Sequence, residues 1–193
     1  MGRTQNKRIK QKARRRRRRT KILVHQNRTA LKLVIPGVSA QQSYGYVVNG
    51  ASPSQTMEMR INIKGSTHLG GTGACLTSSI AWLFGPTADP GVKNFVEQLD
   101  AWVLSWAKLD ATDRKETRRT WAIAVGEIVM GKSISHTKGP AEATIVALLQ
   151  LGWKPSAPDR WEVDNNTAVK LNGEAYTRFQ ITARAQHDAQ VKL

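Results

Sequence analysis

Residues 90–106 read PGVKNFVEQLDAWVLSW, and this stretch decides the fold class. Its large apolar side chains recur at spacings of three and four residues, which places them on one face of an α-helix of about four turns. The stripe consists of Val92, Phe95, Val96, Leu99, Trp102, Val103 and Trp106. Tryptophans on so regular a stripe indicate core packing, and stacking on nucleobases is the alternative use of Trp102 and Trp106. We therefore predict a mainly helical protein.

Further helices are expected on both sides of this stretch. Residues 74–84 read as a buried helix with Cys75 packed at its start, and two more helices are expected at 110–131 and 139–152. Residues 161–171 alternate on both sides of a polar turn, which predicts a β-hairpin before a final helix. The seams of the helical bundle are expected to bury Phe95, Leu99, Trp102, Val103, Trp106, Trp121, Val125, Ile128, Ile145 and Leu149.

The N-terminal part of the chain is also expected to be helical. Residues 3–35 contain neither glycine nor proline, and the basic half of this stretch has few apolar residues to pack. A further helix is expected to begin at Ser52-Pro53 and to stop at Gly65. The predicted fold class is thus mainly α, with a basic N-terminal helix or arm, a helical bundle and a small C-terminal β-hairpin.

Positive charge is concentrated at the N-terminus. The chain of 193 residues has a formal net charge of +16, and residues 1–21 hold 12 Lys or Arg and no acidic residue. Such a block repels itself, so we expect residues 1–20 to be poorly held until a polyanion neutralises them. Nucleic acid is the natural polyanion, because its phosphates release counterions when Lys or Arg binds them. The expected contacts are Lys7, Arg8, Lys10, Lys12, Arg14, Arg15, Arg16, Arg17, Arg18, Arg19, Lys21 and Arg28.

The same run has two plainer interpretations. It resembles a nuclear or nucleolar targeting signal, and it could also be a solvated arm that keeps the chain in solution. Phosphate contact carries no base sequence, so the run cannot distinguish RNA from DNA. We expect a nuclear or cytoplasmic, reducing location, because the one cysteine cannot form an internal disulfide and no secretory signal is seen. No apolar run approaches 18 residues, so no membrane partner is expected.

Catalytic chemistry has little support in the sequence. The four histidines are isolated, and none lies near Cys75 in a metal-ligand spacing. Glu162 and Asp164 share a strand face, but a two-metal site needs further carboxylates. We therefore expect no catalytic residues, no metal and no cofactor.

Several motifs occur in an order that resembles the segment after the palm in non-LTR (LINE-type) retroelement reverse transcriptases, in particular the divergent Arg-rich elements of some protists. These are the run Arg14–Arg19, then Pro36, Tyr44-Gly45, Gly50 and Ser52-Pro53, then Gly73-Ala74-Cys75-Leu76 to Gly85, Asp89-Pro90, Trp102, Trp106, Gly139-Pro140, Gly152-Trp153 and Pro158-Asp159-Arg160-Trp161. The resemblance implies a thumb and connection segment that contacts the backbone of an RNA, DNA or RNA–DNA duplex. Its partners would be the palm and ribonuclease H domains of a larger polyprotein.

The resemblance suggests a division of the chain. Residues 1–21 would be a nucleic-acid-binding arm, 22–64 a thumb-like helical segment, 65–153 a helical bundle, and 154–193 the hairpin and C-terminal helix. The chain departs from the family in having no Asp-Asp pair, so it would be a non-catalytic segment or a fragment of an RNA-directed DNA polymerase. Two other classes remain open: a coat protein with an Arg-rich arm that packages RNA, and a basic nucleolar or ribosome-associated RNA-binding protein.

Overall fold

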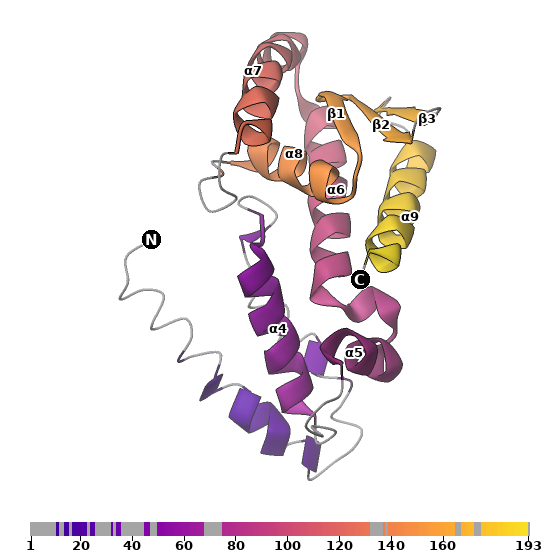
Figure 1. The fold of residues 1–193 in the computed structure, drawn as a ribbon. Helices are drawn as coiled ribbons and strands as arrows, with labels where there is room; N and C mark the ends of the chain where they lie inside the picture. Colours follow the sequence, from indigo (N-terminus) through magenta and orange to yellow (C-terminus); the bar gives the residue numbers. More distant parts are fainter. Residues whose placement is uncertain are drawn as a thin grey trace. The chain divides into compact units, whose positions relative to one another are not determined.

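The computed structural model describes residues 11, 14–15, 17–22, 24–25, 32, 34–35, 45–46, 50–67, 75–131, 137, 139–164, 167–171 and 175–192. This part is mainly helical, with a small antiparallel sheet before the final helix (Figure 1), which confirms the predicted fold class. The chain divides into two compact units, one from residues 1–44 and 53–90 and the other from residues 45–52 and 91–193. Among the described helices, none is both long and apolar enough to cross a membrane.

The first unit contains α4 (Pro53–Ser66), α5 (Leu76–Phe84) and the short 3-10 helix η3 (Pro86–Ala88). α4 begins at Pro53 as expected, because proline presets the backbone angle of a first helical turn. α4 packs against α5, and the two helices share a small core with residues from the N-terminal part of the chain. That core consists of Val24, Val34, Ile63, Ile80 and Ala88.

Cys75 is exposed, so the expectation that it packs in the core is wrong. It is the N-cap residue of α5, which begins at Leu76. The buried side chain of α5 is that of Ile80. Five residues separate Cys75 from Ile80, and at 3.6 residues per turn they lie on different sides of the helix.

A buried ion pair connects α4 to the segment after η3. Arg60 donates hydrogen bonds from Nε and Nη2 to the two carboxylate oxygens of Asp89, at 2.8 and 2.7 Å. The side chain of Asp89 is 1% exposed, and this two-pronged contact stabilises its charge. The pair therefore fixes the end of the first unit against the middle of α4.

The second unit is built on α6 (Pro90–Lys108), α7 (Ala111–Val129), α8 (Pro140–Gln150) and α9 (Ala175–Val191). α7 begins where expected, since the Asp110 carboxylate accepts a hydrogen bond from the backbone N–H of Asp113 at 2.7 Å. α8 begins at Pro140 after Gly139, whose φ of 89° is one that glycine adopts without strain. Both helices therefore begin where the sequence predicts.

Three strands, β1 (Lys154–Ala157), β2 (Arg160–Asp164) and β3 (Thr167–Lys170), form an antiparallel sheet in that order. β2 and β3 are the predicted hairpin, with Trp161 opposite Val169. β1 was missed because Pro155 interrupts any strand pattern. In the structure β1 is an edge strand, where the missing N–H of proline is tolerated.

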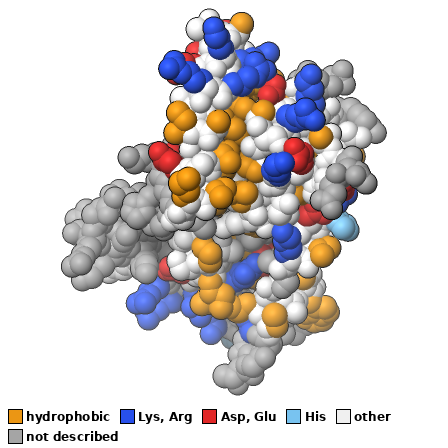
Figure 2. Space-filling model, turned by 45° about the horizontal axis from the view of Figure 1, so that its top comes forward, with side chains coloured by type: hydrophobic (Ala, Val, Ile, Leu, Met, Phe, Trp, Pro, Cys, Tyr) orange, Lys and Arg blue, Asp and Glu red, His pale blue; other side chains and the backbone are white. Residues whose placement is uncertain are grey.

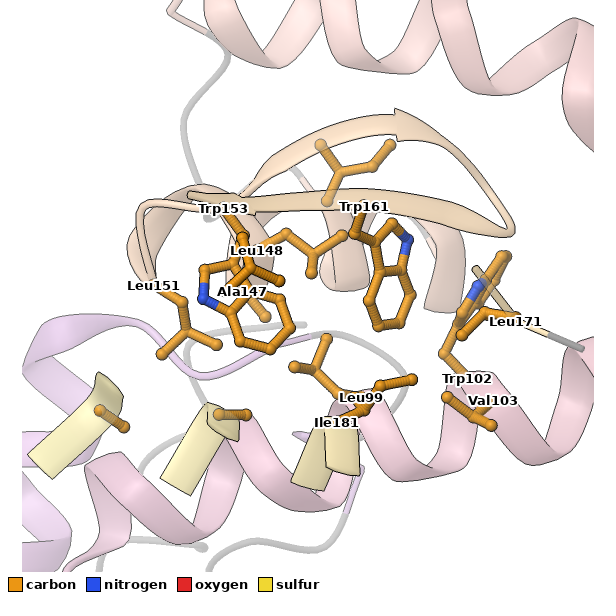
Figure 3. Packing of buried hydrophobic residues seen from close by; sticks show 14 of the residues in the cluster. Leu99, Trp102, Val103, Ala147, Leu148, Leu151, Trp153, Trp161, Leu171 and Ile181 are labelled. Carbon is orange, nitrogen blue, oxygen red and sulfur yellow. The ribbon is translucent and has the colours of Figure 1, made fainter. Parts of the chain in front are cut away.

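The core of the second unit lies between these helices and the sheet (Figure 3) and is rich in tryptophan. Trp102 lies 5.2 Å from Trp121 between ring centroids, and each indole N–H is satisfied by a backbone carbonyl, of Pro158 and Pro155 respectively. Trp153 donates to the carboxylate of Asp188 on α9 at 2.8 Å. All ten predicted core residues are buried in this cluster or packed against it. Trp102 and Trp106 are thus core residues and are not available to stack on bases.

Candidate nucleic-acid interface

The described part of the arginine run is helical and has two different sides. Val24 is buried in the core of the first unit, and Arg17, seven residues earlier, is half-buried. A separation of seven residues is about two helical turns, so both side chains lie on the packed side. Arg15 and Arg19 lie on the opposite side and Arg14 and Arg18 lie between the two sides, and all four are exposed. Lys21 is exposed as well.

This arrangement gives four guanidinium groups at the spacing i, i+1, i+4 and i+5. Residues four apart are neighbours on a helix surface, so Arg14 lies next to Arg18 and Arg15 next to Arg19. A planar guanidinium can bind a phosphate through two hydrogen bonds. The four exposed guanidinium groups of this helix therefore have the chemistry that phosphate binding requires. Six of the predicted contacts lie outside the described residues: Lys7, Arg8, Lys10, Lys12, Arg16 and Arg28.

Arg17 is held by α4. Its guanidinium lies over Gly65, so closely that a Cβ added to Gly65 would be 2.2 Å from Cζ, Nε and Nη2. Residues 1–20 were expected to be poorly held, and this is wrong for Arg17, which packs against α4. Gly65, in the last turn of α4, has no side chain and so leaves room for the Arg17 guanidinium. Neither the charge nor the apolar spacing of the sequence predicts this contact.

A second group of cations, at the N-terminal half of α7, was not among the predicted contacts. Arg114 and Arg118 lie over the ring of Trp106, 5.7 and 5.3 Å from its centroid. Arg118 also donates to the carboxylate of Asp159 at 2.7 Å, which raises the pKa of the guanidinium. Arg114 and Arg118 therefore make stabilising contacts within the second unit.

Two further cations of α7 face solvent. Lys115 and Arg119 are exposed, and neither forms an ion pair with the part of the chain that the structure describes. Figure 2 shows Lys and Arg side chains gathered at the top of its view, with hydrophobic side chains below them. Lys115 and Arg119 could have been found in the sequence by asking which cations lie four residues apart on the side of α7 away from Trp121.

The described titratable groups form no cluster of three or more that could hold a metal ion. The backbone N–H of Ser78, at the start of α5, is the main cause of a lowered pKa at Cys75, a free and exposed thiol. Glu162 is bonded to Ser156 and Lys154, and these contacts lower its pKa. Its geometry is that of a surface ion pair on the sheet.

Comparison with protein-family models, with curated proteins and with solved structures finds no match to this chain. The features of the molecule that bear on function are thus the chemistry of the arginine run and its placement.

Proposed function

We propose that this protein is a non-catalytic nucleic-acid-binding module that contacts the phosphate backbone through its arginine run. The observation that carries the proposal is the two-sided character of the run. Arg17 and Val24 pack on the first unit, while Arg14, Arg15, Arg18 and Arg19 face solvent together. A folded unit thus presents four exposed cations of one helix, which favours binding to a continuous polyanion.

A more specific form of the proposal follows the resemblance to retroelement reverse transcriptases. In that form the ligand is a template–primer duplex and the partners are palm and ribonuclease H domains. The coat-protein alternative is less well supported, because coat proteins with Arg-rich arms are mostly β-sandwiches and the described body is mainly helical. A nucleolar or ribosome-associated protein would use the same contacts on RNA.

The experiment is a titration of fluorescently labelled duplex DNA and single-stranded RNA, followed by anisotropy. The test variant replaces Arg14 to Arg19 with Gln. The control variant replaces six exposed cations of the second unit with Gln: Lys108, Lys115, Arg119, Lys154, Arg160 and Lys170. Both variants lower the formal net charge from +16 to +10, so the two are matched in total charge and differ in where it is lost.

We expect the test variant to lose at least about tenfold in affinity for every sequence alike, because phosphate contacts do not read bases. The control variant should lose much less. Equal losses in the two variants would contradict the proposal, since binding would then follow total charge and not the run. Loss confined to one base sequence would also contradict it.

A further inference from the structure

One tryptophan of this chain is treated differently from the others. Five of the six lie in the core of the second unit, where each is at most 6% exposed. Trp82, on α5 of the first unit, is 79% exposed. It follows Ile80, the buried residue of α5, by two positions, so it lies about 200° further around the helix, on the side away from the core. An exposed indole gains free energy when a flat apolar partner covers it, so Trp82 is suited to stacking.

The helix surface around Trp82 leaves its ring accessible. The neighbouring positions along this side of α5 are four residues earlier and three residues later, and they are Ser78 and Gly85. Ser78 is small and exposed. A Cβ added to Gly85 would meet nothing within 4 Å, so the space on that side is open too. A flat group can therefore approach residue 82 without displacing a large neighbour.

The first unit also carries most of the positive charge of the chain. It contains 16 Lys or Arg residues and only two acidic residues, Glu58 and Asp89, of which Asp89 is paired with Arg60. Residues 75–88, which include α5, contain no acidic residue. Such a unit attracts polyanions, so the partner that covers Trp82 should combine negative charge with a flat apolar group. A nucleic-acid strand has both, in its phosphates and its bases.

We propose that Trp82 stacks on an unpaired base of a strand whose phosphates contact the arginine run, so that the preferred ligand is single-stranded nucleic acid. The inference rests on the proposed function and adds the class of nucleic acid to it. Val24, just after the run, and Ile80 belong to one core, so both contacts are made by a single folded unit. A duplex would still bind the arginines through its phosphates, but its bases are stacked on one another and would gain nothing from Trp82.

The test compares three labelled ligands by anisotropy: a single strand of about 20 nucleotides, a strand of the same length without bases, and a duplex of the same sequence. The abasic strand keeps the phosphates and removes the stacking partner. Trp82→Ala should lose at least about fivefold in affinity for the strand with bases, and less than about twofold for the other two ligands. Trp82→Phe should keep most of the affinity, because a phenyl ring also stacks on bases.

Phe179→Ala is the matched control, because Phe179 is 69% exposed on α9 of the second unit. It should leave all three affinities unchanged. Circular dichroism of each variant checks that the helices remain folded. Stacking releases no counterions, so Trp82→Ala should also leave the slope of log K against log salt concentration unchanged.

A Trp82→Ala variant that binds the strand with bases as tightly as wild type would overturn this inference. Equal losses for the strand with bases and the abasic strand would overturn it as well, since the effect would then not come from bases. The proposed function is judged separately by the variant that replaces Arg14 to Arg19 with Gln. If that variant loses affinity and Trp82→Ala does not, the arginine contact stands and only the stacking contact is excluded.

Discussion

The guanidinium of Arg17 occupies the space beside Gly65 that any other residue at position 65 would fill with its own side chain. This contact, together with the buried Val24, joins the arginine run to the core of the first unit. The neighbouring arginines are consequently held on the solvent side. Placement of one arginine thus determines which of its neighbours can reach a ligand.

Gly65→Ala should displace the Arg17 side chain without unfolding the first unit. The atoms that a methyl group would meet belong to the end of a flexible side chain, so they can move away. Alanine also gains roughly 0.5–1 kcal/mol of helix propensity, which offsets the lost contact. Thermal denaturation should therefore show little change, whereas a loss of more than about 2 kcal/mol would mean that Arg17 is a structural residue.

How far the sequence predicts this structure depends on the kind of signal. The stripe from Val92 to Trp106 predicts α6 and its core residues, because apolar residues three and four apart share one face of a helix and that face is buried. β1 escaped detection because pairing with β2, not local propensity, makes it a strand. Cys75 is exposed because α5 begins only at Leu76. A sequence pattern does not predict the first residue of a helix to within one position.

In the candidate site too, some features follow from the local sequence and others from contacts between distant residues. The arginine run was evident from charge alone, but its two sides depend on Arg17 meeting Gly65 across 48 residues of sequence. Contacts at that separation come from packing, and a single sequence does not reveal them. The contacts of Arg118 with Trp106 and Asp159 are of this kind too.

Replacement by alanine should have a large effect at one tryptophan and almost none at another. Trp102 is 6% exposed and hydrogen-bonded, so Trp102→Ala should lower the free energy of unfolding by about 3–5 kcal/mol. Trp82 is 79% exposed, so Trp82→Ala should change it by less than about 0.5 kcal/mol. Urea denaturation of both variants measures the difference. Similar values for the two would show that burial has been misassigned.

Asp89→Ala should strongly destabilise the first unit. It leaves the Arg60 guanidinium, itself 16% exposed, without its carboxylate, and breaking a buried pair in this way costs about 3–5 kcal/mol. Replacing both partners with apolar residues, as in Arg60→Met with Asp89→Leu, should recover much of the loss. The comparison is made by chemical denaturation, and a double variant no more stable than Asp89→Ala would argue against an interaction between the two charges.

Asp188 should make stability depend on pH in the acid range. Partial burial acts to raise its pKa, but hydrogen bonds from His187, Trp153 and Arg184 outweigh that effect and hold the pKa below the ordinary value of 3.8. The charged form thus adds stability above the unfolded pKa, and this is lost as pH falls through the lower, folded pKa.

Asp188→Asn should accordingly cost about 1–2 kcal/mol near pH 7, from the loss of hydrogen bonds to a charged group. The difference from wild type should shrink as pH falls below 3.8, measured by urea unfolding at a series of pH values. A difference that stays constant down to about pH 2 would exclude ionisation of Asp188 as its source.

The most direct measurement of the central claim is the salt dependence of binding to duplex DNA. Five to eight neutralised phosphates predict a slope of about −5 to −7 in log K against log salt concentration. Replacing Arg14 to Arg19 with Gln should bring the slope nearer to zero by about 4, since at least Arg14, Arg15, Arg18 and Arg19 face solvent. A variant that keeps the wild-type slope and affinity would contradict the account, because the arginine run would then be no part of the nucleic-acid contact.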